Sequence, residues 1–541
     1  MDTREATVPQ RDRGTTRTLR MTTNRVLALA AVAAVGLSAC TTGGAGGGGE
    51  GTSTIRTAIN AAPTTFTPWE VQNRDDYMIS RLLFNTLVRR GTDNTIVPAL
   101  ATSWETTPTT AQLTLREGAT CADGTPITPG VVKDSLDAMA TAEVSVFREI
   151  VFGPGRPTIS ADDAAGTVTV ELAQPWLDLM QGLSLEASGI VCPAGLADQE
   201  GLRTGSVEAA FSGPYVLSAS SHGVSYTFAL REGFTAWPEY DPPVTGEPGQ
   251  TVQVDVVGND SARANALLTG GMDIADINTE DMTRFDGQEG YTTHRLPYLA
   301  LYLLFNERPG SVFADEAPRR AAAQALSREA LNSAASGGLG ELAVTFSHAA
   351  VPCANTDPSV LVPQDVAAAT GVLSGLSAPI KVLGMDVIGP QGAANSYVAE
   401  ALRAAGAQVE LNNVDVATWS TTGATEPGAW DVTVFPAINA GGTMYGALSP
   451  IIGPPTEDGG ANWSGLRRED VLALVDEAMR RPDEQARCGV YQQIQETLIG
   501  GAHVMPLSYS PEQSIARPGF SINAYNNQID ISTMRIVEDK S

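Results

Sequence analysis

Histidine and cysteine are among the side chains that most often carry nucleophilic, acid–base or metal chemistry. This chain of 541 residues has four histidines and five cysteines. The histidines are His222, His294, His348 and His503. A hydrolase needs a nucleophile beside a base, or a cluster of metal ligands. The sequence contains neither G-x-S-x-G nor H-E-x-x-H, and its cysteines are not spaced as metal ligands. We therefore expect no catalytic residues, no metal site and no cofactor.

The first cysteine, Cys40, has a distinctive N-terminal context. Basic residues precede an apolar run at 26–37, and the run leads into Ser38-Ala39-Cys40. These are the parts of a secretory signal, and the run is too short to span a bilayer, which takes roughly 20 apolar residues. The Leu-Ser-Ala-Cys sequence resembles the bacterial lipobox, whose cysteine is acylated before cleavage; the alternative is an ordinary signal with a chance cysteine. We expect residues 1–39 to be a lipoprotein signal peptide, and residues 40–53 to be the lipidated Cys40 and a Gly-rich tether.

The charge and the other cysteines limit the partners and the compartment. The formal net charge is −27, which argues against nucleic acid and against broad contact with anionic lipid. No other stretch approaches the length of a membrane span, so lipid is the only membrane anchor that we expect. The remaining cysteines, Cys121, Cys192, Cys353 and Cys488, predict two disulfides in an oxidising compartment, with three possible pairings.

Strand and helix patterns are mixed along the chain, which indicates an α/β or α+β fold. Apolar residues alternate with polar ones at 113–115, 168–172, 226–230 and 252–256, and each run predicts a strand with one buried face. One helix is predicted to begin near Pro318 and to carry Ala322, Leu326 and Ala330 on one stripe. Another is predicted to begin at Glu469-Asp470 and to end at Arg480-Arg481-Pro482.

Short segments follow one another in a characteristic order between about residue 54 and residue 510. In chain order they are Leu82-Leu83-Phe84-Asn85-Thr86-Leu87-Val88, Pro98-Ala99-Leu100-Ala101, Leu115-Arg116-Glu117-Gly118, Asp123-Gly124-Thr125-Pro126, Gly213-Pro214-Tyr215-Val216-Leu217, Gly271-Met272-Asp273-Ile274-Ala275, Tyr302-Leu303-Leu304-Phe305-Asn306 and Val504-Met505-Pro506-Leu507. This ordered set resembles the extracellular solute-binding proteins (family five) of the oligopeptide, dipeptide and nickel ABC importers.

The resemblance implies a two-lobed α/β fold of the periplasmic-binding-protein type (class II, with an extra subdomain in the first lobe) and a ligand cleft between the lobes. Lobe one would comprise 54–270, with an inserted subdomain at about 75–205; lobe two would comprise 271–500, and 501–541 would return to lobe one. The pairing Cys121–Cys192 and Cys353–Cys488 is preferred, because each disulfide then lies within one lobe.

The function implied by the resemblance is that of a substrate-binding lipoprotein of an ABC importer. It would capture peptides or other small solutes outside the membrane as a monomer and deliver them to the permease subunits, held on the extracytoplasmic face by lipid only. Binding energy would shift an equilibrium between open and closed lobes, and no bond would be broken. A non-transport surface receptor of the same fold and a secreted hydrolase are the alternatives.

The resemblance also places candidate ligand contacts. Peptide-binding relatives hold the peptide ammonium with an aspartate that follows a Trp-Asp pair; here Trp430-Asp431 is followed by Asn439, and no acid occurs before Glu457. A neutral Asn439 could not make the charge-assisted hydrogen bond that an ammonium favours, so the ligand need not be a free peptide. For Asn306, a strand-end cap is an equal alternative, and for Trp430 core packing is the favoured alternative. The candidates are Asn60, Phe66, Trp69, Asn306, Trp419, Trp430, Phe435, Asn439, Tyr445 and Trp463.

Overall fold

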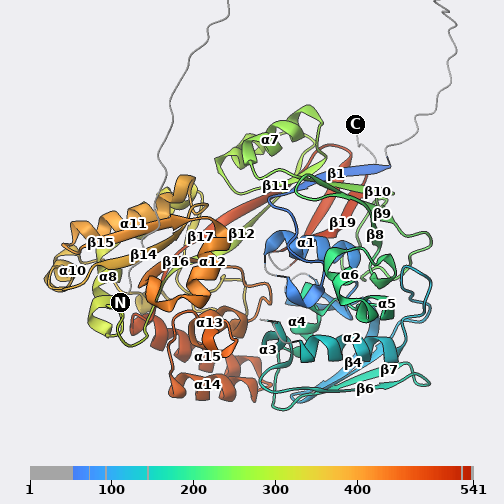
Figure 1. Ribbon diagram of the computed structural model, residues 1–541, viewed down its shortest axis with the longest axis horizontal. Helices are drawn as coiled ribbons and strands as arrows, with labels where there is room; N and C mark the ends of the chain where they lie inside the picture. Colours follow the sequence, from blue (N-terminus) through green and yellow to red (C-terminus); the bar gives the residue numbers. More distant parts are fainter. Residues whose placement is uncertain are drawn as a thin grey trace, which may run out of the picture. The chain divides into compact units, whose positions relative to one another are not determined.

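The computed structural model describes residues 53–71, 73–91, 94–142, 145, 147–525 and 528–537. The expected signal peptide, the lipidation site Cys40 and nearly all of the tether lie outside the described residues. The described chain contains three larger sheets and two small two-stranded ones (Figure 1).

The first sheet has the strand order β1-β10-β9-β8. Its strands are β1 (Thr54–Ile59), β8 (Tyr215–Ser221), β9 (Ser225–Leu230) and β10 (Thr251–Val256). β1 runs parallel to β10, and the other neighbours are antiparallel. Tyr226, Phe228, Val252 and Val254 are buried, whereas the residues between them reach solvent. The alternating runs at 226–230 and 252–256 therefore form strands with one buried face, as predicted.

The second sheet has the order β4-β5-β7-β6, and it lies within the range expected for the inserted subdomain. Its strands are β4 (Ala101–Thr107), β5 (Thr110–Leu115), β6 (Thr158–Asp162) and β7 (Thr167–Glu171), and α2 (Pro129–Thr141) packs on it. α2 begins with Thr128 as its N-cap, whose hydroxyl accepts from the backbone of Val131, and with a proline in the first turn.

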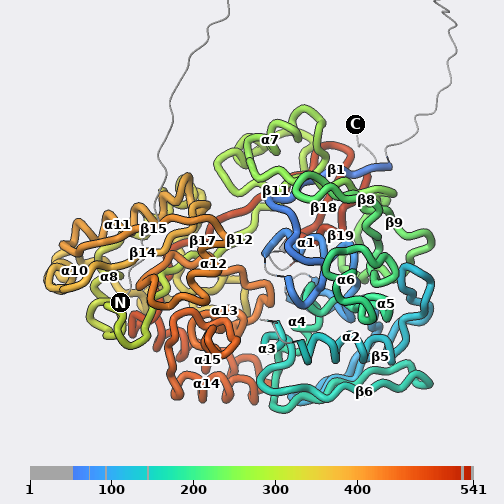
Figure 2. Tube along the Cα trace, viewed as in Figure 1, coloured from blue at the N-terminus to red at the C-terminus, as the bar shows by residue number. Residues whose placement is uncertain are grey.

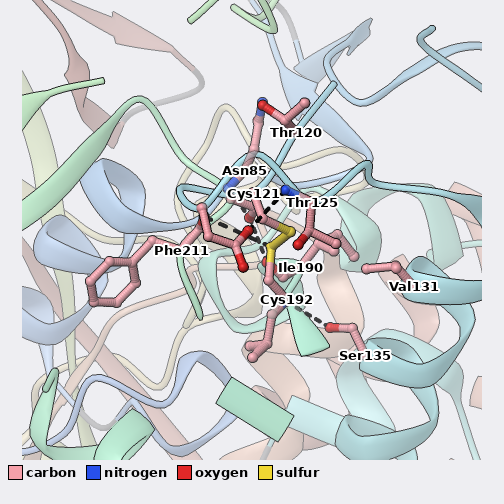
Figure 3. The surroundings of a disulfide bond; sticks show 12 residues. Asn85, Thr120, Cys121, Thr125, Val131, Ser135, Ile190, Cys192 and Phe211 are labelled. Atoms are coloured by element: carbon pink, nitrogen blue, oxygen red, sulfur yellow. Dashed lines mark hydrogen bonds between the residues drawn. A yellow bond between two sulfur atoms is a disulfide. The ribbon is translucent and has the colours of Figure 1, made fainter. Parts of the chain in front are cut away.

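A disulfide joins the loop after β5 to the segment before α5 (Pro193–Ala197). Cys121 and Cys192 are both fully buried, and their Cα atoms are 6.0 Å apart. The Ser135 hydroxyl of α2 accepts from the backbone N–H of Val191 beside the disulfide (Figure 3). A second disulfide joins Cys353 to Cys488. This is the nearest-neighbour pairing that the sequence favoured.

The third sheet, called the large sheet below, has seven strands in the order β11-β17-β12-β16-β14-β15, with β13 (Glu341–Leu342) paired to β17. The others are β11 (Ile274–Ile277), β12 (Thr292–Phe305), β14 (Ile380–Met385), β15 (Val409–Val414), β16 (Val432–Ala437) and β17 (Val504–Ala516). β14, β15 and β16 are parallel, and α11 (Ala393–Ala404) and α12 (Val416–Thr425) connect them. β12 and β17 are long antiparallel partners, from Thr292 opposite Ala516 to Leu304 opposite Val504.

The helix predicted from Pro318 through Ala330 is two helices, so that prediction is wrong. α8 (Glu316–Ala325) ends before Leu326, and α9 (Arg328–Ser336) begins after Ser327. The Ser327 hydroxyl accepts from the backbone N–H of Ala330, and an N-cap of this kind starts a new helix although the apolar stripe continues. The predicted helix from Glu469 is confirmed as α14 (Glu469–Met479).

Among the other helices, α15 (Glu484–Gly500) packs against β17, α10 (Val366–Leu373) packs on α8, and α13 (Met444–Ile452) contacts α14. The chain then finishes in a hairpin of β18 (Phe520–Tyr525) and β19 (Gln528–Ile536), which lies against α1 (Arg74–Leu83); Figure 2 shows this red hairpin beside the blue α1. The lobe boundaries stay a prediction. Within the described ranges, no helix combines the length and the apolar character that crossing a bilayer requires.

Candidate ligand-binding site

The predicted ligand contacts do not lie in one cluster. Four of them, Trp419, Trp430, Phe435 and Trp463, pack with Tyr302 beside the large sheet. The Trp419 and Trp463 rings are 4.4 Å apart, and Phe435 stacks on Tyr302 at 5.4 Å. All except the half-buried Phe435 are buried. Such pairs add about 1 kcal/mol each to the stability beyond the area they bury. These rings therefore have a role in the core, and their contact with a ligand stays a prediction.

Polar groups around this cluster are used within the fold. Trp419 Nε1 donates to Thr433 Oγ1 at 3.0 Å. Asn306 Nδ2 donates to the backbone oxygens of Pro427 and Trp430 at 2.6 and 3.0 Å. Asn306 is buried directly after β12, so its bonds agree with the role of a cap at the strand end. Its contact with a ligand is a separate prediction that these bonds do not test.

Three further candidates, Asn60, Phe66 and Trp69, lie between β1 and α1. Two carboxylates in the first turn of α1 hold this segment. Asp75 accepts from two backbone N–H groups that follow β1, at 3.2 and 2.9 Å, and Asp76 accepts from a third at 2.8 Å. Trp69 is buried, whereas Asn60 and Phe66 are half-buried. The segment is thus fixed by α1, whose N-terminal partial charge favours both acids.

The last two candidates are Asn439, in the loop after β16, and Tyr445, in the first turn of α13. Asn439 Nδ2 donates to the backbone oxygen of Thr443 at 2.9 Å, and its Oδ1 is buried without a partner among the described residues. The Thr443 hydroxyl caps α13 by accepting from Gly446. Asn439 therefore braces its own loop. A carboxylate in this place would face the carbonyl oxygen of Thr443, which explains why an amide suits the loop.

Residues 440–445 also contact segments that lie far away in the sequence. Tyr445 Oη donates to Glu149 Oε1 at 2.8 Å, and the Tyr445 ring stands edge-on to Trp176 at 4.6 Å. Arg90 Nη2 donates to the backbone oxygen of Ala440 at 2.9 Å. These partners belong to α3 (Phe147–Phe152), the segment before α4 (Leu179–Leu183), and β2 (Val88–Arg90). Residues 440–445, which end the loop and begin α13, thus join the region of the large sheet to that of the N-terminal sheets.

A small cavity lies at this junction. Its volume is about 30 Å³, and it is lined by Ser145, Arg148, Glu149 and Ile150 on one side and by Tyr445, Ser449, Pro454 and 459–461 on the other. A water molecule needs about 10–15 Å³ measured in this way, so the cavity has room for water and not for a larger solute. The Ser145 hydroxyl is buried and has no partner among the described residues, which would suit such a water.

Burial shapes the ionisation of the groups at the junction. It raises the pKa of Glu149, although the hydrogen bond from Tyr445 opposes the rise. Burial likewise raises the pKa of Asp178, the residue before α4, against the attraction of Arg487. Burial lowers the pKa of Arg90 to about 10. Charges of both signs are thus taken out of water where the two regions meet, and this costs free energy unless their partners stay in place.

A second buried polar group lies where α1 meets the large sheet. Arg74, the first residue of α1, donates to Asp276 of β11 and to Glu512 of β17, the latter at 2.9 Å. Both acids are only 4% exposed. Burial, together with the charge of Asp276 and against that of Arg74, raises the pKa of Glu512 to about 7. One guanidinium therefore ties α1 to two strands, and one of its partners titrates near neutral pH.

This titration gives a testable pH dependence. A carboxyl whose pKa is raised by folding stabilises the fold below its unfolded pKa, and this stabilisation is lost as pH rises through the folded value. We expect the free energy of unfolding of the wild type to fall, between about pH 5 and about pH 8, more steeply than that of Glu512→Gln. Urea denaturation at a series of pH values measures both profiles. Parallel profiles would show that Glu512 keeps an ordinary pKa.

No metal site is evident in the described part of the chain, where no three His, Cys, Asp or Glu side chains are grouped to hold an ion.

Comparison with known proteins decides the family. Residues 95–454 match the family model described as bacterial extracellular solute-binding proteins, family 5, middle. The chain belongs to this family. Its members are extracytoplasmic solute-binding proteins of ABC importers for peptides or similar ligands, and its relatives are binding proteins rather than enzymes.

Solved structures and one curated relative agree with this family. A substrate-binding protein from Microbacterium hydrocarbonoxydans, complexed with 4-hydroxybenzoate hydrazide, is 40% identical with a TM-score of 0.82, over 90% of this chain and 100% of that one. The periplasmic binding protein DppA from Helicobacter pylori, in complex with the peptide STSA, has the same fold at 18% identity, with a TM-score of 0.74 over 89% and 98% of the two chains. Protein XP55 of Streptomyces lividans is 26% identical over 528 residues, which are 91% of this chain and 90% of that protein.

The predicted two-lobed α/β fold and the family are thereby confirmed.

Sequence reasoning missed the residues of the junction, Arg90, Glu149, Trp176 and Asp178, and the charged group around Arg74. No local pattern marks them, because the contacts that bring these regions together join distant parts of the chain, as for Glu149 and Tyr445 with a separation of 296. Two consecutive arginines at the end of a buried strand, Arg89 and Arg90 of β2, were the available signal.

Proposed function

We propose that this protein is the lipid-anchored substrate-binding component of an ABC importer, which captures peptides or peptide-like solutes as a monomer and delivers them to its permease. The observation that carries the proposal is the contact of residues 440–445 with Arg90, Glu149 and Trp176. This contact joins the region of the large sheet to the region of the N-terminal sheets. Long strands make the other connection between the two regions. Ligand enclosure between two halves requires such a contact, which can form and separate.

The ligand need not be a free peptide. The resemblance implies that Asn439 takes the place of the acid of peptide-binding relatives, and its amide donates to the Thr443 carbonyl oxygen of its own loop. An ammonium group at this place would find no charge-assisted partner on the loop. The Microbacterium relative was crystallised with a small hydrazide, which supports a solute range wider than peptides. A blocked or modified peptide, or a small solute with an uncharged end, fits these observations.

Native mass spectrometry of the purified protein tests ligand capture. The protein without its leader is expected to carry a co-purified ligand, and the adduct should disappear on denaturation. A ladder of mixed peptide masses would support a carrier that reads the peptide backbone, and a single small mass would support a dedicated solute. A protein that carries no ligand, and that no peptide or solute library stabilises against heat, would contradict the proposal; a ligand at 100 times its Kd should add about 2.7 kcal/mol of stability.

The anchor has its own test. Replacing Cys40 with alanine is expected to release the protein from the membrane or to leave the precursor unprocessed, because the acylated thiol is lost. Membrane fractionation and intact-mass measurement of the wild type and Cys40→Ala would show this. Ligand affinity should stay unchanged. A Cys40→Ala protein that still fractionates with the membrane after processing would contradict the lipid anchor.

A further inference from the structure

Three aromatic side chains lie close to one another, and the ring of one of them contacts the guanidinium of Arg74. They are Tyr77 of α1, Phe147 of α3 and Tyr298 of β12, and they are called the aromatic triad here. The rings of Tyr77 and Phe147 meet edge to face at 5.8 Å, and the Arg74 guanidinium lies 5.6 Å from the centre of the Tyr298 ring. Phe147 is buried, whereas Tyr77 and Tyr298 are half-buried. The triad thus brings together residues from α1, from α3 beside the junction cavity, and from β12 of the large sheet.

The phenol groups of the triad are not used by the fold. Neither the hydroxyl of Tyr77 nor that of Tyr298 has a hydrogen-bond partner among the described residues, although both rings reach solvent. The structural tyrosines differ: Tyr215 donates to Gly249 at 3.0 Å, and Tyr509 donates to Ser347 at 2.7 Å. A half-buried hydroxyl without a protein partner is satisfied by water or by a ligand. Two such hydroxyls on neighbouring aromatic rings are suited to hold a planar group.

The charges around the triad select against anions. Arg74 is the nearest cation, but Asp276 and Glu512 already bind it, and Asp75 lies 3.9 Å from it. The group therefore has no surplus positive charge to offer an incoming carboxylate. Burial raises the pKa of Tyr298 well above its ordinary range, with Arg74 opposing and Glu512, Asp75 and Tyr77 adding to the rise. Both phenols stay protonated and can donate to a neutral oxygen.

We propose that the aromatic triad is a subsite for an uncharged aromatic carboxamide group of the ligand. The ligand ring packs against Tyr77, Phe147 and Tyr298, and its carbonyl oxygen accepts from the phenol of Tyr298 or Tyr77. An aromatic carboxylate of the same shape is rejected, because its charge would lie beside Asp75, Asp276 and Glu512. The subsite rests on the proposed function, since it assigns part of the same ligand site. It also specifies the chemical class of the ligand, which the junction and Asn439 do not.

Benzamide and benzoate test the subsite, because they share one shape and differ in charge. Binding to the full chain is measured by calorimetry or by ligand-observed NMR. Benzamide should bind at least about tenfold more tightly than benzoate, a ratio that corresponds to about 1.4 kcal/mol. Tyr298→Phe and Tyr77→Phe keep the rings and remove only the hydroxyls. At least one of them should weaken benzamide about fivefold, the usual worth of one hydrogen bond, and neither should change Tm appreciably.

The matched control is Tyr291→Phe, whose hydroxyl makes only a marginal 3.5 Å contact with Leu267. It should bind benzamide as the wild type does. Three results would overturn the subsite: benzoate bound as tightly as benzamide, no benzamide binding up to its solubility limit, or both Phe variants indistinguishable from Tyr291→Phe. Native mass spectrometry keeps this failure apart from failure of the proposed function. A protein that still carries a co-purified ligand would remain a solute carrier without this subsite.

Discussion

Replacing Arg74 with methionine is expected to lower the free energy of unfolding by about 3–5 kcal/mol at neutral pH, because it leaves two buried carboxylates without their cation. Asp276 and Glu512 are each 4% exposed, so water cannot replace the guanidinium. Urea denaturation, followed by tryptophan fluorescence, would measure the loss. The deficit should shrink in acid, since burial raises the pKa of Glu512 to about 7 and its protonation removes part of the unpaired charge.

Two controls separate this charge effect from lost packing. Arg74→Met combined with Glu512→Gln should recover part of the stability, because only one buried carboxylate then lacks its partner. Arg403→Met makes the same substitution at an arginine whose ion pair with Glu400 is largely exposed. It should change stability by less than about 1 kcal/mol. Equal losses for the single and double Arg74 variants, or for Arg74→Met and Arg403→Met, would show that the ion pairs do not hold α1.

Removing the Cys121–Cys192 disulfide is expected to cost about 4 kcal/mol, from the entropy that a cross-link takes from the unfolded chain. The bond closes a loop with a sequence separation of 71, and both cysteines are fully buried. The double variant Cys121→Ser, Cys192→Ser should therefore show a lower Tm and a lower urea midpoint than the wild type. Differential scanning calorimetry and urea denaturation measure both.

Reduction provides the control for this prediction. The double variant Cys121→Ala, Cys192→Ala buries no hydroxyl groups, unlike the double serine variant. The loss of stability that the two double variants share therefore measures the effect of the disulfide alone. Excess reductant should destabilise the wild type further than either variant, since the variants retain only Cys353–Cys488. A pair of double variants as stable as the oxidised wild type would contradict the prediction.

Local patterns carried the parts of the fold that the sequence predicted well. The strands at 226–230 and 252–256 alternate because one face is buried, and α14 has a full apolar stripe between acidic and basic ends. The pairing of four cysteines also followed once the lobes were expected. These features depend on near neighbours or on a known family order, so a single chain is enough to reveal them.

The site was less predictable, for two physical reasons. An aromatic side chain meets similar surroundings in a core and in a cleft, so Trp419, Trp430 and Trp463 were as good candidates as Tyr445 from sequence alone. Contacts such as Glu149 with Tyr445 depend on where distant elements meet in space, and no periodicity encodes them. The stop at Leu326 illustrates a smaller version of the problem: Ser327 began a new helix within an unbroken apolar stripe.

The terminal hairpin has a consequence for how the protein is made. Residues of β19 lie against α1 and β1, and the backbone of Ile536 bonds with Glu247 in both directions. β1, the first strand of the described chain, therefore lacks part of its surroundings until β19 has been synthesised. Contacts that span the whole sequence form slowly. The chain is consequently expected to stay loosely structured during secretion and to complete its N-terminal region only after release, so truncation of the last strand should reduce export yield before it affects ligand affinity.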